Sequence, residues 1–166
     1  TKIYIKKILS AIKTFKDINI IFTAPNADSG YKQINKEINT FIKKKENCYY
    51  IKSFGRDDYL SCLKLSSVII GNSSSGIIEA PSFKTSSINL GNRQKGRIKS
   101  KSTIDCEIET SKIKKVLKQK LNKRINNKRD YFYNPYFKKD SSKMILKILK
   151  KTNTEYLIKK SFFDII

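Results

Sequence analysis

The chain has 166 residues, a one-domain length, and a formal net charge of +22 that comes almost entirely from lysine. Such a charge is typical of proteins that bind nucleic acid or anionic surfaces. Here, however, arginine is scarce and the chain is enriched in Ile, Asn and Lys together, so we interpret much of the charge as lying on solvated faces. The absence of histidine excludes a Ser-His-Asp triad, a Cys-His pair and histidine-based metal sites within this chain.

Strand and helix patterns alternate along the chain up to residue 90. Short apolar runs predict strands, and apolar residues that recur at helical spacing predict amphipathic helices. We expect strands near 18–23, 48–52, 67–71 and 86–90, and helices at 2–16, 31–45, 57–65 (capped by Asp57) and 76–83. This alternation predicts an α/β fold, a parallel sheet with helices on both faces. Because an α/β domain normally begins with a strand, the opening helix indicates a chain that starts within a larger fold.

The remainder of the chain is expected to add a short strand and further helices. Residues 104–106 are expected to form a strand, and 112–121 and 141–151 amphipathic helices. Between these helices, residues 123–139 lack periodicity and contain a cluster of aromatic side chains. Residues 155–163 are expected to form a last helix, whose many apolar residues dock on something that this chain does not contain.

The stretch Ser67–Phe83 is the centre of the expected fold. A β-branched strand is followed by the polar loop Gly71–Ser75 and then by a helix-compatible segment that begins at Gly76. The first N–H groups of a helix have no partner and carry partial positive charge. With serine hydroxyls as further donors and no bulky side chains, such a loop is suited to bind a phosphate.

Glu79 lies about one helical turn after Gly76 and is expected to face back toward the same loop. A carboxylate would repel a phosphate but could accept two hydrogen bonds from a sugar diol, so the two features together indicate a nucleotide. The alternative is that the serines form a surface turn and that Glu79 is a solvated helix residue. A second polar loop, Asn92–Arg97, follows the next strand. Because ligands of parallel sheets bind at the carboxyl ends of strands, the two loops are expected to converge on one crevice.

The cysteines Cys48, Cys62 and Cys106 are odd in number and widely spaced, so they form no CxxC pair and no metal-ligand pattern. The sequence has no signal peptide and no apolar run of membrane-spanning length. We therefore expect a protein of the reducing cytoplasm.

Three runs, Phe22–Asp28, Gly71–Phe83 and Asn89–Arg97, resemble the hydrolysing UDP-N-acetylglucosamine 2-epimerases, most closely the bacterial branch that feeds sialic and legionaminic acid synthesis. The resemblance covers nearly the whole chain in order. It implies one half of a glycosyltransferase-B type fold, namely the second of its two Rossmann-like domains. Residues 1–150 would be this UDP-binding domain, and residues 151–166 a C-terminal helix that packs against an N-terminal domain absent here.

The resemblance also implies roles for individual residues. Ser73 and Ser74 would hold the diphosphate, and Glu79 the ribose hydroxyls. The other matching positions are those that line the UDP site, Asn26, Lys32 and Arg93, and those that meet the uracil through the backbone, Ser53 and Phe54. For three of these a structural role stays open: a solvated helix residue for Lys32, a loop cap for Arg93 and a turn residue for Asn26. The chain departs from the family pattern at Ala24 and at Thr85–Ser87, and neither is expected to touch the ligand.

The reaction implied by the resemblance is elimination of UDP from UDP-N-acetylglucosamine, through a glycal, followed by addition of water to give N-acetylmannosamine. It needs no metal or redox cofactor. In the family the catalytic acidic residues lie in the first domain and a functional histidine just before the matching segment, so no catalytic residue carries over and this chain alone is expected to be inactive. The implied partners are a UDP-sugar, the N-terminal domain and a second copy in a homo-oligomer, rather than a membrane or a nucleic acid.

Two other functions remain open. One keeps the fold and changes the reaction, as the nucleotide-sugar domain of a glycosyltransferase. The other is a basic nucleic-acid-binding domain, which would need aromatic residues interleaved with arginine on one face. The aromatic cluster at 131–137 has mostly lysine beside it, with Arg129 as the nearby arginine.

Overall fold

The computed structural model describes residues 2–27, 29–122 and 131–153. By its internal contacts the chain divides into two units, Thr1–Pro135 and Tyr136–Ile166. The larger unit contains the candidate site, and the described part of the smaller unit contains one helix. Among the described helices, none combines the length and the apolar character that crossing a membrane requires.

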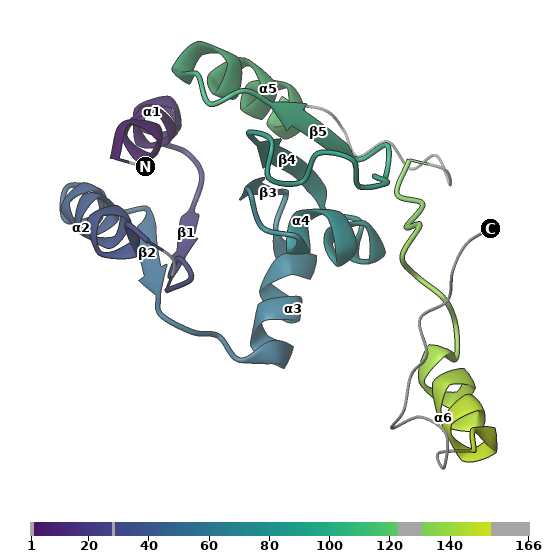
Figure 1. Ribbon diagram of the computed structural model, residues 1–166. Coiled ribbons are helices and arrows are strands. Elements are labelled where there is room, and N and C mark those ends of the chain that lie inside the picture. The colour runs from purple at the N-terminus through teal and green to yellow at the C-terminus, as the bar shows by residue number, and fades with distance from the viewer. Residues whose placement is uncertain (1, 28, 123–130, 154–166) are drawn as a thin grey trace, which may run out of the picture. The chain divides into compact units, whose positions relative to one another are not determined.

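The observed elements follow the predicted alternation closely (Figure 1). In chain order they are α1 (Lys2–Ile12), β1 (Ile20–Thr23), α2 (Tyr31–Ile42), β2 (Cys48–Ile51), α3 (Arg56–Leu65), β3 (Val68–Gly71), α4 (Ser75–Ile78), the 3-10 helix η1 (Ala80–Phe83), β4 (Ser86–Leu90), β5 (Thr103–Cys106), α5 (Thr110–Asn122) and α6 (Ser141–Lys151). The last predicted helix, at 155–163, lies outside the described residues.

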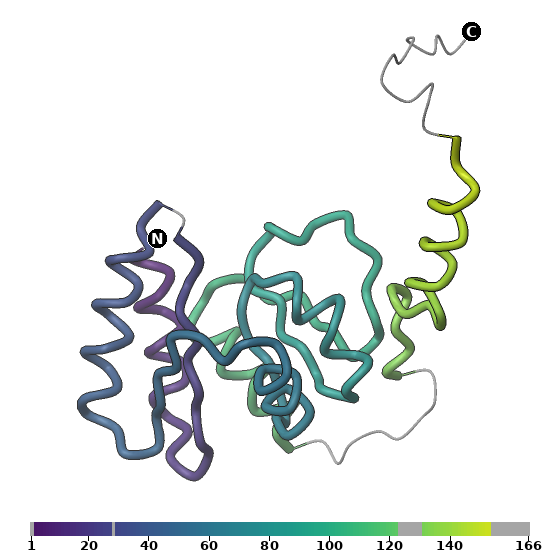
Figure 2. The backbone as a smooth tube through the Cα atoms, turned by 90° about the horizontal axis from the view of Figure 1, so that it is seen from below, coloured from purple at the N-terminus to yellow at the C-terminus, as the bar shows by residue number. Residues whose placement is uncertain are grey.

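The described strands pair in parallel, as predicted, but they form two sheets rather than one. β1 pairs with β2, and β3, β4 and β5 form a second sheet in that order. The two groups are joined through helices instead of strand hydrogen bonds, since α1 packs against both α2 and α5 (Figure 2). At the α1–α5 contact, the Thr110 hydroxyl donates to the Lys7 carbonyl at 3.2 Å.

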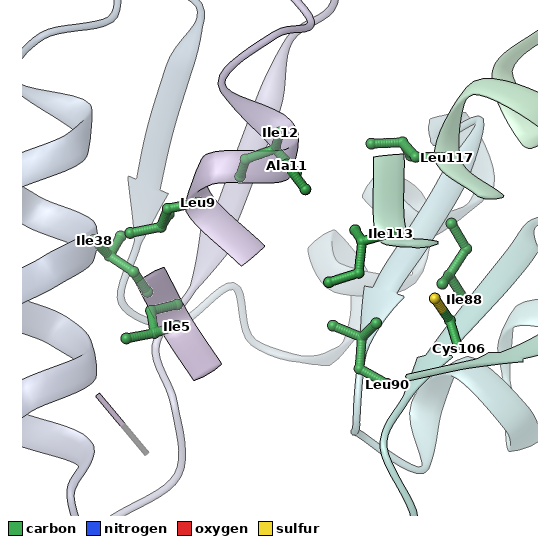
Figure 3. Close-up of a cluster of buried hydrophobic side chains, with 10 residues drawn as sticks. All are labelled: Ile5, Leu9, Ala11, Ile12, Ile38, Ile88, Leu90, Cys106, Ile113 and Leu117. Carbon is green, nitrogen blue, oxygen red and sulfur yellow. The ribbon is translucent and has the colours of Figure 1, made fainter. Parts of the chain in front are cut away.

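Helices cover both faces of the β3-β4-β5 sheet. Successive strand residues point to opposite faces, so Ser87 and Ile88 of β4 face different layers. Ile88 is fully buried in one cluster with Ile113 of α5 (Figure 3). On the other face, a Cβ at Gly76 of α4 would lie 2.5 Å from the Ser87 Oγ, so α4 lies almost on the strand. The prediction of a parallel sheet with helices on both faces is therefore confirmed.

The β1-β2 sheet is covered by α2 on one face. The Phe22 ring of β1 meets the Phe41 ring of α2 edge-on at 6.1 Å, and the Tyr50 hydroxyl of β2 donates to Asn35 of α2 at 3.0 Å. On the opposite face, Ile21 and Tyr49 are paired in register and exposed. This sheet therefore contributes only one side to the core.

Several helix boundaries differ from the prediction, among them the end of the second helix, which is Ile42 rather than residue 45. The first helix ends at Ile12 rather than at residue 16. The third begins at Arg56 after Gly55, so Asp57 is not its cap and lies instead in the first turn, where a carboxylate favours the helix dipole. The predicted helix 76–83 is split into α4 and η1, because Pro81 has no N–H to donate to the preceding turn.

In the second unit, α6 has the predicted limits, Ser141–Lys151, but none of its residues is buried. Its apolar face stays exposed in the described structure, with Met144, Ile145, Ile148 and Leu149 between 42% and 64% accessible. The amphipathic pattern therefore predicts the helix correctly, but its apolar face is not buried in the described structure.

The buried contact of α5 with β4 leads to a stability prediction. Because Ile113 is fully buried, Ile113→Ala should lower the free energy of unfolding by about 2–5 kcal/mol. Leu65→Ala is the matched control: it removes an apolar side chain that is 86% exposed, and should change stability by about 0.5 kcal/mol or less. Urea unfolding followed by circular dichroism measures both, and equal effects would contradict the described core.

Candidate functional site

The predicted site residues follow the carboxyl ends of successive parallel strands. The residues that follow strands β1 to β4 in turn are Asn26, then Ser53 and Phe54, then Ser73 and Ser74, then Arg93. Lys32 lies in the first turn of α2, just after the loop that contains Asn26. These are the positions at which parallel α/β sheets bind ligands.

A direct hydrogen bond joins the two polar loops that follow β3 and β4. The Gln94 side-chain amide donates to the Asn72 carbonyl at 2.9 Å, and Gln94 is only 4% exposed. Its other polar atom, Oε1, is buried without a hydrogen-bond partner among the described residues. The loops therefore meet as predicted. Sequence reasoning gave Gln94 no role, because its polarity within a polar loop does not distinguish it from its neighbours.

The serine loop, Ser73–Ser75, leads into helix α4, and the Ser74 side chain does not cap this helix. The Ser74 carbonyl instead accepts from the Ile77 and Ile78 N–H groups at 2.9 and 2.8 Å. The Ser73 hydroxyl accepts from the Ser75 N–H at 3.3 Å. Because α4 is a single turn, its macrodipole is small, and binding of an anion would depend on the serine hydroxyls and on loop N–H groups outside these bonds.

Glu79 is the C-cap of α4, and its N–H donates to the Ser75 carbonyl at 3.0 Å. Its carboxylate oxygen Oε2 is buried and has no hydrogen-bond partner within the described part of the chain. A buried acceptor without a partner is costly, and such atoms are rare in folded proteins. One oxygen of this carboxylate therefore has an unused hydrogen-bonding capacity near the serine loop.

Tyr59 of α3 connects two of the predicted binding segments, and sequence reasoning did not select it. Its hydroxyl forms a short hydrogen bond with the Ser75 hydroxyl, and its ring meets the Phe54 ring edge-on, with centroids 6.3 Å apart. Burial raises the pKa of Tyr59, the Ser75 hydrogen bond lowers it, and the nearby Glu79 charge raises it again. The signal in the sequence is weak, because Tyr59 falls at an ordinary position of an amphipathic helix.

Among the described residues, three of the predicted site residues are not linked to the serine loop or to Glu79. Asn26, Lys32 and Arg93 are exposed. In the described structure, no hydrogen bond or ion pair joins any of them to the serine loop or to Glu79. Their place at the strand ends fits a binding role, but their side chains are not held in position.

Two surface hollows of the described structure are lined by residues outside these loops. One, of about 330 Å³, lies along the lysine-rich side of α6. The other, of about 280 Å³, is lined by Lys99, Ser100, Lys101 and Tyr133. Since Ser53, Ser73 and Arg93 are exposed, the candidate site is an open edge of the sheet rather than an enclosed cavity.

Comparison with known proteins decides which family has this arrangement. Residues 1–150 match the family described as UDP-N-acetylglucosamine 2-epimerase. The chain belongs to this family. Over 166 residues it is 37% identical to the polysialic acid biosynthesis protein P7 of Escherichia coli, a match that covers 97% of this chain and 41% of that protein. Over 165 residues it is 37% identical to the GDP/UDP-N,N'-diacetylbacillosamine 2-epimerase (hydrolyzing) of Campylobacter jejuni, covering 97% of this chain and 42% of that protein.

Solved structures of UDP-GlcNAc 2-epimerases share the fold. That of Methanocaldococcus jannaschii, in complex with UDP-GlcNAc and UDP, matches with a TM-score of 0.67 at 24% identity and covers 91% of this chain and 40% of its own. That of Neisseria meningitidis, bound to UDP-GlcNAc, matches with a TM-score of 0.62 at 18% identity and covers 90% and 40%. The predicted fold, one half of a glycosyltransferase-B type, is thereby confirmed. This epimerase-family chain spans about two fifths of the length of the curated relatives it matches.

The environment of Tyr59 can be tested by titration. Glu79→Gln removes a negative charge that disfavours the phenolate, so it should lower the pKa of Tyr59. Ser75→Ala removes the hydrogen bond that favours the phenolate and should raise it. Carbon-13 tyrosine NMR against pH, with Tyr59→Phe to assign the resonance, measures both shifts. Glu37→Gln, in α2, is the control and should leave the Tyr59 titration unchanged; an equal response to both glutamate substitutions would refute the described proximity.

Proposed function

We propose that this chain is the nucleotide-binding part of a hydrolysing UDP-N-acetylglucosamine 2-epimerase. The observation that carries the proposal is the buried Glu79 oxygen without a partner beside a loop of serine donors. Donors for a diphosphate next to an acceptor for a diol are the complement of a nucleoside diphosphate. Membership of the epimerase family supports the same ligand class.

Each residue of the proposed site then has a role. Ser73 and Ser74 bind the diphosphate, and Glu79 accepts hydrogen bonds from the two ribose hydroxyls. The remaining residues form the rim, with Ser53 and Phe54 next to the base and Asn26, Lys32 and Arg93 as polar or charged groups at the strand ends. The exposure of these last three fits side chains that become ordered when the ligand arrives.

The substrate we propose is UDP-N-acetylglucosamine, which is converted to N-acetylmannosamine and UDP for nonulosonic acid synthesis. The names of the relatives support this assignment, since one belongs to polysialic acid biosynthesis and the other is a hydrolysing 2-epimerase. The second name contains N,N'-diacetylbacillosamine, so a diacetamido sugar on the same nucleotide is the nearest competing substrate.

The chemical share of this chain is to stabilise the departing UDP. As the bond between the sugar and the diphosphate breaks, negative charge grows on the diphosphate, and preoriented N–H and hydroxyl donors lower the energy of that charge. The groups that remove and return protons at the sugar belong, in this proposal, to the remainder of a longer enzyme. Residues 151–166 would form the helix that packs against that remainder.

Binding of UDP tests the central assignment. Glu79→Ala should weaken UDP binding about 10- to 100-fold, because charge-assisted hydrogen bonds to the ribose are lost. Pyrophosphate, which has no diol, should not bind more weakly to this variant. Ser74→Ala should weaken both ligands. Calorimetry measures the affinities of the two ligands for each variant.

The high positive charge requires a control, because any polyanion is attracted to such a surface. The titrations are therefore repeated at high salt, where exposed charges are screened. Glu37→Ala removes an equal charge from α2 and should leave UDP binding intact. Unchanged UDP affinity of Glu79→Ala at high salt would show that Glu79 is an ordinary helix residue.

Turnover provides a second test. The purified chain should release no UDP from UDP-N-acetylglucosamine, because the proposed acid and base groups are not among its residues. A coupled assay that detects free UDP measures this directly. Release above the rate without protein would show that an Asp, Glu or Lys of this chain acts as the base.

A further inference from the structure

We propose that Tyr59 is a positioning residue that holds the base-binding segment and the phosphate-binding loop at a fixed separation. The inference rests on the proposed function and adds a determinant of ligand choice to it. Through Tyr59, the site would select a whole uridine diphosphate over uridine or pyrophosphate alone.

The contacts of Tyr59 reach both segments from one side chain. The edge of its ring meets Phe54, beside the proposed base position, and its hydroxyl is hydrogen-bonded to Ser75, within the serine loop. The Glu79 carboxylate is close enough for its charge to act on the phenol. Tyr59 therefore lies among the base, phosphate and ribose groups of the proposed site.

A glycine turn leads into α3, and a buried hydrogen bond anchors the C-terminal end of this helix. Between Phe54 and α3, Gly55 has φ 70° and ψ −177°, a conformation that glycine adopts and other residues avoid, and it lets Phe54 precede the helix closely. At the other end of α3, the buried Thr85 hydroxyl donates to the Leu63 carbonyl at 2.6 Å. A side chain on a helix anchored in this way is held better than one on a loop.

The hydrogen bond between Tyr59 and Ser75 also distinguishes the roles proposed for the three serines. In this proposal the Ser75 hydroxyl holds Tyr59, and its neighbours Ser73 and Ser74 bind the ligand. When two subsites are held at the spacing of one ligand, the second contact forms without further loss of freedom. A displaced serine loop would still bind each fragment but would lose this advantage.

Two substitutions separate the functions of the hydroxyl and the ring. Tyr59→Phe keeps the ring contact and removes the hydrogen bond, so UDP should bind about 3- to 10-fold more weakly, while pyrophosphate and uridine, which each meet one segment, are unaffected. Tyr59→Leu also removes the ring contact, so UDP should lose a further factor of about 3 to 10, again with little change for pyrophosphate or uridine. Calorimetry or tyrosine NMR titration with these three ligands gives the affinities.

Tyr50→Phe is the matched control. It removes another half-buried phenol that is hydrogen-bonded to a side chain, Asn35, but lies on β2 against α2. All three affinities should stay unchanged in this variant. In the Tyr59→Phe background, Ser75→Ala should cause no additional loss, because the bond it would break is already absent. Thermal unfolding of each variant confirms that the comparison is between folded proteins.

The outcomes distinguish this inference from the proposed function. If the unmodified chain binds neither UDP nor pyrophosphate, the proposed function falls, and the role of Tyr59 falls with it. If the unmodified chain binds UDP and Tyr59→Leu binds it equally well, only the role of Tyr59 is overturned. Equal losses for all three ligands in both Tyr59 variants would reduce it to general packing.

Discussion

The close approach of Gly76 to Ser87 is the constraint on which the candidate site depends. A side chain at Gly76 would collide with the Ser87 hydroxyl at 2.5 Å, so α4 can lie on β4 only because one residue has no Cβ and the other is small. This contact sets where α4 begins and hence where the preceding serines and the following Glu79 are placed. It also gives a structural reason for the small residue at 87.

Buried polar atoms without partners concentrate around the ends of β3 and β4. In the described structure these are Glu79 Oε2, Asn89 Oδ1 and Gln94 Oε1, and only Thr103 Oγ1 lies elsewhere. Such atoms weaken a fold, because they lose hydrogen bonds to water without replacement. Parallel sheets bind ligands at the carboxyl ends of their strands. The location of these atoms therefore fits the proposed site for a polar ligand.

Much of the fold was predictable because the pattern of apolar residues is local and strong. The predicted apolar faces of α1, α2 and α5 all join the buried cluster, and each predicted strand up to residue 90 lies within two residues of an observed one. The breaks were harder to predict. Pro81 splits the helix after the serine loop, and α6 keeps its predicted limits while burying none of its residues.

The sequence alone determined which segments are strands and helices, and that polar loops follow the strands, because hydrophobic spacing and turn residues act over a few positions. Only the tertiary structure decided which polar side chains meet. Tyr59 and Ser75 are 16 residues apart, and Gln94 and Asn72 are 22 apart. Lys120, which helical spacing places on the same face as Ile113 and Leu117, is buried and donates to the Ser102 carbonyl and the Tyr131 hydroxyl, both at 2.8 Å. Such partnerships depend on how strands and helices stack in space, and residue type carries no information about a partner that distant along the chain.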